Sequence, residues 1–284
     1  MIQSLKTIKN RIRSTENTKK VTAAMEMVSV SKLNRIERNL LALRPYVTAL
    51  NSLMHNLINS CDNPVHSFLA EKTPLNKICL CVITSDSGLC GAYNNNIIRV
   101  AEQFINSRGR EKVDLVCVGR KGFNYFKRSN FNILNTYIGM NGRFSEKVCA
   151  GITDNLVSLF VSGAETQVYI AYTHFKTALV NEPKVEKILH IESESKTKTE
   201  YILEPDMEAV LNEIIPKYIS MKIKLIILEA FTAEHSARTL AMKTATDNAK
   251  DLLQGLVLLR NKVRQANITQ EIMEIISSSE ALKG

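Results

Sequence analysis

The sequence predicts an α/β fold: a doubly wound, mostly parallel sheet domain with two long terminal helices that form an antiparallel coiled coil. At both ends of the chain, apolar residues recur in steps of three and four over long stretches, as on helices that pair through a narrow seam. In the middle, short apolar runs alternate with amphipathic stretches, which is typical of a parallel sheet with crossover helices. We expect an N-terminal coiled-coil helix over residues 1–60, the sheet domain over 74–203 and a C-terminal coiled-coil helix over 204–284.

The first segment is predicted to be helical throughout. Its second half carries an uninterrupted seam at Leu33, Ile36, Leu40, Leu43, Val47, Leu50, Met54 and Leu57. Its first half begins with Ile2, Leu5, Ile8 and Ile12 and continues with small or soft residues at Thr15, Thr18, Val21 and Met25. Pro45 removes one backbone hydrogen bond and clashes with the preceding turn, so we expect a local kink there.

The middle segment has the pattern of alternating strands and helices. Strands are expected at 77–84, 113–119, 132–138 and 166–175, with a weaker edge strand at 184–191. Helices are expected at 94–107, 120–129 and 145–163, the last with Ser145 as its N-cap and Gly163 as its end. Cys79 and Cys81 alternate within the first strand and should share one face of the sheet. Residues 192–200 are interpreted as a solvated loop.

The third segment returns to a helical pattern that contains a single proline, Pro216, and a single glycine, Gly255. We expect its seam at Leu252, Leu256, Leu259, Val263, Ala266, Gln270 and Met273. One helix of about 75 residues would be roughly 110 Å long, more than a compact domain needs. The two terminal helices are therefore expected to pair with each other as a rod, and the last part of the C-terminal helix to protrude without a partner.

The net charge of +9 is concentrated near the N-terminus, because residues 1–38 hold nine Lys or Arg and three Asp or Glu, a balance of +6. Such a field favours an acidic partner, which could be nucleic acid, an anionic lipid surface or an acidic protein patch. A solvated helix face explains the same charge. The hydrophobic fraction of 45% is ordinary for a globular protein. No apolar run approaches the length of a transmembrane helix.

No catalytic, cofactor or metal site is predicted. The six cysteines include no CxxC pair, and we interpret them as buried, reduced thiols. The loop at residues 84–96 contains Gly88 and Gly91 but fits neither GxGxxG nor GxxxxGK[ST], so it is interpreted as a structural strand-to-helix turn. His235 follows Glu234 without an HExxH pattern and is interpreted as a histidine of the helix surface or seam.

Polar side chains near the end of the C-terminal helix suggest a partner surface. Arg264, Gln265, Asn267, Thr269 and Gln270 combine guanidinium, amide and hydroxyl groups on a helix that does not need them for solubility. These groups could donate hydrogen bonds to another protein, although a solvated face is the simpler alternative.

Four stretches of the chain, 17–33, 84–96, 233–253 and 261–276, together resemble the γ subunits of bacterial F-type ATP synthases. The resemblance covers essentially the whole chain in the same order. It implies a non-catalytic rotor: paired helices form a shaft inside a ring of three α and three β subunits. The sheet domain, together with the ε subunit, stands on the membrane ring of c subunits, and proton flow turns the shaft so that the β-subunit sites make ATP. No cofactor is implied.

The resemblance also implies roles for individual residues. Arg264 and Gln265 match residues that contact a loop of β, and Gln270 belongs to the same predicted contact region. Met25 matches a shaft residue facing an acidic helix-turn-helix of β, a partner that would suit the nearby Lys19, Lys20 and Lys32. Glu204 matches the region near the c ring. The chain departs from the family where Ser278 and Ser279 replace a usual Gly-Ala, and where Met273 replaces a Thr common in some relatives.

The expected location is peripheral, on the cytoplasmic face of a bacterial inner membrane. The basic, amphipathic N-terminus imitates a mitochondrial presequence, but its helical pattern continues without a cleavage-like break. A basic coiled-coil nucleic-acid-binding protein with an α/β head is the alternative, and it would lose affinity steeply with salt. An α/β enzyme with helical arms would instead show activity or bind nucleotide. A rotor shaft would co-purify with α and β subunits.

Overall fold

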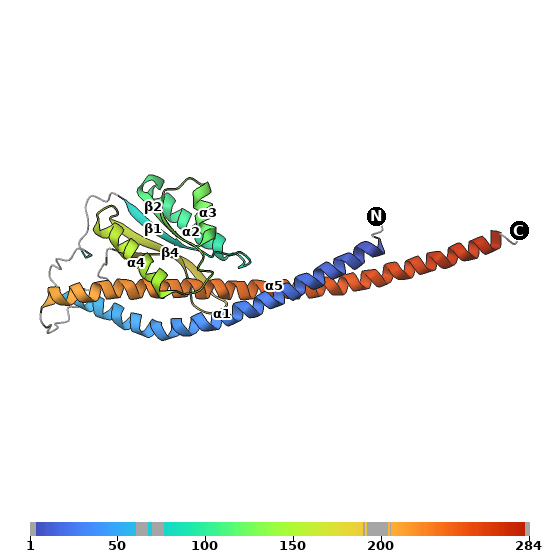
Figure 1. The fold of residues 1–284 in the computed structure, drawn as a ribbon, viewed down its shortest axis with the longest axis horizontal. Coiled ribbons are helices and arrows are strands. Elements are labelled where there is room, and N and C mark those ends of the chain that lie inside the picture. Colours follow the sequence, from blue (N-terminus) through green and yellow to red (C-terminus); the bar gives the residue numbers. More distant parts are fainter. Residues whose placement is uncertain are drawn as a thin grey trace. The chain divides into compact units, whose positions relative to one another are not determined.

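The computed structural model describes residues 4–60, 68–69, 77–189, 191, 204 and 206–281. It divides into two compact units (Figure 1). The sheet unit is Ser29–Arg238, and the helix-pair unit combines Met1–Val28 with Thr239–Gly284. Two long helices, α1 (Leu5–Ser60) and α5 (Met207–Ala281), each supply residues to both units.

The sheet unit contains a five-stranded, mostly parallel sheet, as predicted. Its strands are β1 (Ile78–Ile83), β2 (Val113–Val118), β3 (Ile133–Tyr137), β4 (Gln167–Phe175) and β5 (Asn181–Leu189), in the order β3-β2-β1-β4-β5. The first four strands run parallel, and β5 pairs antiparallel with β4 at one edge. Both β1 and β2 are buried along their whole length, as expected of strands covered on two faces.

Helices cover both faces of the sheet, so the doubly wound prediction is confirmed. On one face, α2 (Tyr93–Arg108) and α3 (Arg120–Arg128) pack with Leu80 and Val82 of β1. On the other face, α4 (Glu146–Val161) and residues of α1 and α5 pack with Cys79 and Cys81 (Figure 1). A short 3-10 helix, Arg110–Lys112, precedes β2.

The cysteines of the sheet are buried thiols. Cys79 and Cys81 share one face, as the alternation predicted, and both are 0% exposed. Burial raises the pKa of Cys117 to about 12 and that of Cys81 well above its ordinary value, so both thiols stay protonated at neutral pH. Cys61 lies outside the described residues.

Within the sheet unit, α1 and α5 pack on each other and on the sheet. The predicted α1 seam is buried from Leu33 to Leu57, with Leu43 only partly covered. The Tyr218 hydroxyl of α5 donates to Asn51 Oδ1 of α1 at 2.6 Å. The sequence predicted pairing between the helices but not that both would also cover a sheet face. Both helices continue through their prolines, Pro45 and Pro216.

A buried glutamate joins the helices to β4. Arg44 of α1 donates to Glu229 Oε1 of α5 at 2.9 Å, and the same guanidinium group donates to the Phe175 carbonyl. His174 Nδ1 lies 2.6 Å from the other carboxylate oxygen of Glu229. These contacts fix the axial position of both helices on the sheet.

The boundaries of α4 differ in one detail from the prediction. Ser145 is the N-cap residue with an extended backbone, as predicted, although its side chain makes no capping hydrogen bond. Gly163 follows the helix with a φ of 76°, a left-handed conformation that glycine adopts without a Cβ penalty.

Two carboxyl groups lie side by side near the amino ends of the central strands. Asp114 accepts from Lys77 Nζ at 2.8 Å and from Asn132 Nδ2 at 2.9 Å. Glu165 is 1% exposed beside it. Burial, together with the Asp114 charge, raises the pKa of Glu165 from 4.5 to about 7, so the pair is held with a proton on Glu165.

The raised pKa of Glu165 predicts that the free energy of unfolding falls as the pH rises, and that Glu165→Gln removes this loss. The folded-state pKa is raised, so as pH rises from 4.5 to about 7 the unfolded chain releases a proton that the folded chain retains, and stability falls. Glu165→Gln cannot ionise and should gain about 1–3 kcal/mol relative to wild type between pH 5 and pH 8. Urea unfolding at the two pH values measures the difference. The exposed Glu111→Gln is the control, and a Glu165→Gln curve parallel to wild type would contradict the assignment.

Candidate functional site

The helix-pair unit brings together residues from the two ends of the chain. Ile8 of α1 is 0% exposed, and Met242, Ala249 and Leu256 of α5 are buried in the same unit. Thr246 Oγ1 donates to Thr22 Oγ1 at 2.8 Å across the pair. A row of buried apolar side chains and one threonine–threonine hydrogen bond therefore join the two helices in this unit.

The predicted seam of the helix-pair unit is confirmed only in part, since Ile8 and Leu256 are buried as expected but other positions are not. Val21, Leu252 and Leu259 were expected inside, yet they are 57%, 56% and 39% exposed. Lys19 and Thr22 are partly buried instead, facing a seam on α5 that runs through Leu253 and Leu256. A straight α-helix has 3.6 residues per turn, so a strict 3.5-residue count drifts off the contact face over several turns.

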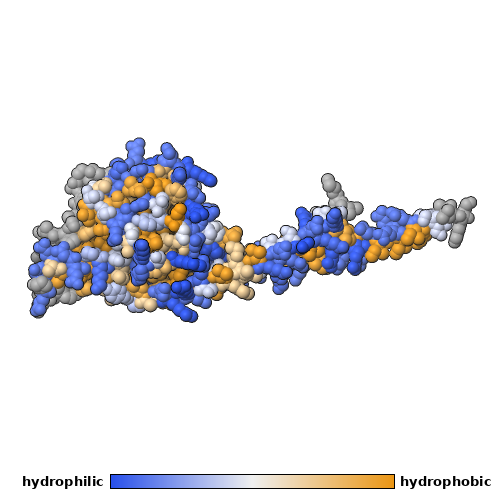
Figure 2. Space-filling view, viewed as in Figure 1, coloured by the Kyte–Doolittle hydropathy of each residue, from blue (hydrophilic) through white to orange (hydrophobic). Residues whose placement is uncertain are grey.

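Beyond Val263, α5 is not covered by any described residue of the helix-pair unit. Every side chain from Arg264 to Ser279 is exposed, which confirms that no described residue of the chain covers the last part of the helix. Large apolar side chains lie on this end at Ile268, Ile272, Met273, Ile275 and Ile276, between 47% and 66% exposed. Figure 2 shows hydrophobic surface along this end of α5. Covering each such side chain would contribute about 1.5–3 kcal/mol, so the surface is suited to a protein partner.

The predicted contact residues of this end lie on the same exposed stretch. Arg264, Gln265 and Gln270 all face solvent. Gln270 Nε2 donates to Glu274 Oε1 at 2.9 Å, and Thr269 Oγ1 donates to the Gln265 carbonyl at 3.0 Å. The stretch therefore offers a guanidinium group and amides beside apolar side chains, the combination found at protein interfaces.

The predicted contact residues of α1 fall into different surroundings. Lys19 lines a groove of about 530 Å³ with Glu16, Lys250, Leu253, Gln254, Val257 and Leu258. Lys20 is exposed, whereas Met25 is partly buried. Lys32 belongs to the sheet unit, where its Nζ donates to the Asn141 carbonyl at 3.3 Å. Glu204 is exposed, three residues before α5 begins.

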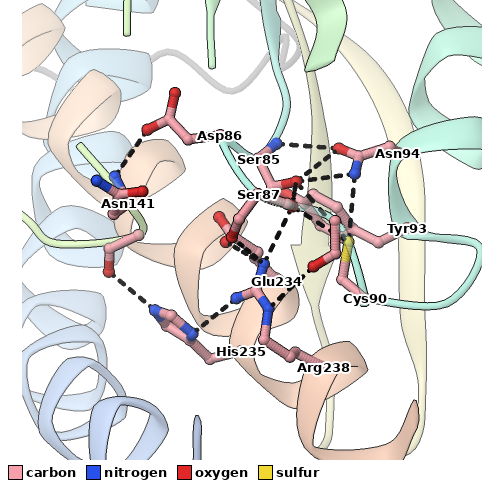
Figure 3. A network of polar contacts seen from close by, with 12 residues as sticks. Ser85, Asp86, Ser87, Cys90, Tyr93, Asn94, Asn141, Glu234, His235 and Arg238 are labelled. Carbon is pink, nitrogen blue, oxygen red and sulfur yellow. Dashed lines mark hydrogen bonds and ion pairs between the residues drawn. The ribbon is translucent and has the colours of Figure 1, made fainter. Parts of the chain in front are cut away.

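The loop after β1 is a hydrogen-bonded turn, as the sequence interpretation had it. Ser85 donates from its backbone nitrogen to Asn94 Oδ1 at 3.0 Å and from its hydroxyl to the Ser87 carbonyl at 2.6 Å. Asn94 Nδ2 also donates to Cys90 Sγ at 3.2 Å (Figure 3). The polar groups of the loop thus bond largely to one another, and the Ser87 and Gly88 carbonyls also accept hydrogen bonds from α5.

A buried charged cluster on α5 donates hydrogen bonds to these carbonyl oxygens. Arg238 donates to Glu234 Oε1 at 2.8 Å, to the Ser87 carbonyl at 3.3 Å and to the Gly88 carbonyl at 3.4 Å (Figure 3). Arg238 is 6% exposed and Glu234 is 1% exposed. Burial raises the pKa of Glu234, an effect that the adjacent guanidinium group opposes. The Tyr93 hydroxyl donates to the Ala230 carbonyl at 3.0 Å and adds a second connection between the loop region and α5.

His235 extends the same network and corrects the sequence interpretation. It is 1% exposed, not on the helix surface or in a coiled-coil seam. Its Nδ1 accepts from Arg238 at 3.2 Å and its Nε2 donates to the Gly142 carbonyl at 2.9 Å, which requires the neutral ring with its proton on Nε2. Burial lowers its pKa to about 4, in agreement with that form. Gly142 has a φ of 63°, and a Cβ there would lie 2.4 Å from His235 Nε2.

Asp86 connects the loop after β1 to two further loops. Its carboxylate accepts from the backbone nitrogens of Arg120 at 3.0 Å, Gly139 at 3.1 Å and Asn141 at 2.7 Å. The loops after β1, β2 and β3 and the middle of α5 therefore form one polar assembly. The sequence did not indicate the roles of Asp86, Glu234, His235 and Arg238, because the loops that this cluster contacts lie far away along the chain.

Two kinds of feature are absent from the described residues. Among them, no group of three or more His, Cys, Asp or Glu side chains is placed to hold a metal ion. A search of the described helices for a segment long and apolar enough to cross a bilayer finds none. Most polar groups of Figure 3 are hydrogen-bonded to one another and join the loops to α5, although the buried Glu234 Oε2 has no hydrogen-bond partner among the described residues.

Comparison with known proteins gives one consistent family. A family model described as ATP synthase matches residues 4–282. The chain is 38% identical to the ATP synthase gamma chain of Chloroflexus aurantiacus, across 98% of this chain and 99% of that one. It is 37% identical to the gamma chain of Geotalea uraniireducens and 34% identical to that of Chlorobium phaeobacteroides, with 99% of each chain covered in both cases.

Solved structures share the fold. A chain of the Euglena gracilis mitochondrial ATP synthase structure that contains OSCP, F1 and the c-ring matches with a TM-score of 0.71 and 16% identity, covering 98% of this chain and 94% of that one. A chain of the central stalk and c-ring structure from Tetrahymena thermophila matches with a TM-score of 0.62 and 24% identity, covering 79% and 99%. The chain belongs to the ATP synthase gamma-chain family, the non-catalytic central-stalk or rotor subunits of that enzyme.

Proposed function

We propose that this chain is the central shaft that couples proton-driven rotation of a c ring to conformational change at the catalytic sites of β subunits. The observation that carries the proposal is the exposed, partly apolar end of α5 from Arg264 to Ser279, which no residue described by the structure covers. The related chains come from a Euglena structure with F1 and the c-ring and from a Tetrahymena structure of the central stalk and c-ring, which supports the same kind of assembly here.

Different parts of the chain would contact different partners. The helix-pair unit, with Arg264, Gln265 and Gln270, would lie inside the ring of α and β subunits. Met25, Lys19 and Lys20, and Lys32 as well, would face an acidic segment of β. The region around Glu204 would lie near the c ring, with the ε subunit against the sheet unit. The chain would be peripheral on the cytoplasmic face of a bacterial inner membrane, attached through the c ring.

A shaft needs stiff helices and a surface that can move against the surrounding subunits, rather than a catalytic group. The continuous backbone hydrogen bonding of α1 and α5 supplies axial stiffness, and the Arg44–Glu229–His174 contacts hold both helices to the sheet. Apolar side chains on the exposed end of α5 can slide against a surrounding ring, because dispersion contacts have no fixed direction. A torque applied to the sheet unit would therefore reach the helices through packed contacts.

Replacement of Arg264 and Gln265 together by alanine tests the proposed contact. Both side chains are exposed, so the variant should keep the thermal stability of the isolated chain. In the assembled complex, ATPase turnover should fall by about threefold or more, because lost interface hydrogen bonds cost about 0.5–1.5 kcal/mol each. Lys112→Ala, exposed in the sheet unit and therefore outside the proposed contact, serves as the control. Turnover equal to that of the control would remove these two residues from the contact.

A further inference from the structure

The apolar seam between α1 and α5 does not by itself fix how the two helices are aligned along their length. On α1 the seam from Leu33 to Leu57 repeats every seven residues with Leu, Ile, Val or Met at each position. A slip of one heptad, about 10 Å along a helix, would still place apolar side chains against apolar side chains. The part of α5 in the same core offers equally interchangeable residues, namely Ile215, Ile219, Ile223, Ile226 and Ile227.

A partly buried chain of polar contacts, here named the second link, joins α1, α5 and the edge of the sheet. The Tyr218 hydroxyl donates to Asn51 Oδ1 at 2.6 Å, and Lys222 Nζ donates to the same hydroxyl oxygen at 3.4 Å. Lys222 Nζ also lies 3.2 Å from Glu186 Oε1 of β5, and the Tyr172 hydroxyl of β4 donates to Glu186 Oε2 at 2.8 Å. Burial raises the pKa of Glu186, but the Lys222 charge and the hydrogen bonds to the carboxylate outweigh burial and lower the pKa to about 2. The carboxylate is therefore ionised at neutral pH.

The ion pair of Arg44 with Glu229, here named the first link, has the same spacing from the second link on both helices. Arg44 stands seven residues before Asn51 on α1, and on α5 Lys222 stands seven residues before Glu229. Because the two helices run in opposite directions, a single alignment makes both links at once. Both links lie wholly within the sheet unit.

A slip of one heptad would break both links and bring unsuitable groups together. In one direction, Arg44 would move from Glu229 to Lys222, so that two cations would face each other in a partly desolvated place. In the same slip Glu229 would face Glu37, another carboxylate. In the other direction, Lys222 would move against the buried Ile58 and leave its charge unpaired.

We propose that the first and second links set the axial alignment of α1 and α5 on the sheet. Burial of an ion pair seldom adds net stability, because lost hydration offsets the attraction, whereas a polar group in an apolar seam excludes the alignments that leave it unpaired. Under the proposed shaft function, the same links would carry torque from the sheet to both helices. The alignment itself is a property of the isolated chain and does not depend on that function.

A distance between two spin labels measures the alignment of the isolated full chain. Arg38→Cys on α1 and Lys217→Cys on α5 are exposed label sites, and the described native cysteines are buried, so only Cys61 needs replacement by serine. Pulsed electron spin resonance should give a single distance in this labelled chain. Urea unfolding of each variant measures stability in parallel.

Removal of both links should loosen the alignment without loss of stability. The first link is removed by Arg44→Met with Glu229→Gln, and the second by Tyr218→Phe with Lys222→Met; Glu186 keeps its contacts with Lys184 and Tyr172. The fourfold variant should show a second distance that differs by about 10 Å, with a urea midpoint equal to that of the labelled chain or higher. Lys176→Met with Glu182→Gln removes an exposed ion pair that touches neither helix, and this control should keep the single distance.

A charge reversal gives a second test that does not require the fourfold variant to fold. Arg44→Glu opposes two carboxylates in the native alignment, whereas a slip of one heptad pairs the introduced carboxylate with Lys222. The slipped distance should therefore appear in Arg44→Glu, while Arg44→Lys, which keeps the charge, should retain the native distance alone.

A single native distance in both the fourfold variant and Arg44→Glu would overturn the proposal and show that apolar packing sets the alignment. A fourfold variant that keeps one distance but unfolds at lower urea would also overturn it, because the links would then only stabilise the fold. Failure of the chain to act as a shaft would leave these distances unchanged, so the two proposals can fail separately.

Discussion

Replacing Arg238 by methionine should lower the free energy of unfolding by about 3–5 kcal/mol, because the change leaves the Glu234 carboxylate buried without its charge partner. Methionine keeps much of the side-chain length but can donate to neither Glu234 nor the Ser87 and Gly88 carbonyls. The loop after β1 should loosen with it. Denaturant unfolding measures the loss, and hydrogen exchange at residues 85–94 locates it.

A double variant shows whether buried charge is the cause. Adding Glu234→Gln to Arg238→Met removes the orphaned charge and should recover a part of the loss, about 1–2 kcal/mol. Glu234→Gln alone keeps the Arg238 contacts to the loop and should cost less than Arg238→Met. If the double variant were less stable than the sum of the single changes, packing rather than charge would hold α5 to the loop.

Gly119→Ala should be about as damaging, with a loss of about 3–5 kcal/mol, because two separate costs coincide there. Gly119 has a φ of 95°, where an L side chain is strained. Its added Cβ would also lie 2.1 Å from the Thr84 carbonyl oxygen. That oxygen belongs to the backbone at the end of β1, so it cannot move aside without disturbing the parallel pairing of β1 with β2.

Gly109 provides a matched control for this substitution. Its φ is 92°, close to that of Gly119, but nothing lies within 4 Å of an added Cβ. Gly109→Ala should therefore cost only the backbone strain, about 1–3 kcal/mol. The difference between the two variants, measured by thermal unfolding, isolates the contact with Thr84. Equal losses would show that the conformation alone, and not the close approach, requires glycine at position 119.

The sequence predicted the sheet and the seam along the second half of α1, because those features depend on residues close together in the chain. Alternation of Cys79 and Cys81 fixed their common face, and the steps from Leu33 to Leu57 fixed one side of α1. The register near Val21 and Leu252 failed because small residues give a weak pattern, and the drift of a straight helix then decides which side faces inward. The sequence did not predict that α1 and α5 also cover the sheet, because an apolar seam does not indicate which surface it packs against.

The candidate site also has one part that the sequence predicted and one part that it did not. The exposed end of α5 was predictable, because no remaining seam in the N-terminal segment could cover Gln270 or Met273. The polar assembly was not, since Arg238 meets the Ser87 carbonyl across 151 residues of sequence and only the folded chain brings them together. His235 was misread for the same reason. Its acceptor, the Gly142 carbonyl, is a backbone atom that leaves no mark in the sequence.

Direct observation of rotation tests the central claim that the paired helices act as a shaft. The cysteines that the structure describes are buried, so Lys112→Cys, exposed on the sheet unit, can carry a probe once Cys61 is replaced by serine. In complexes immobilised through their β subunits, the probe should turn stepwise in one direction when ATP is added and should stop when ATP is removed. Continued ATP hydrolysis with a stationary probe would contradict the account.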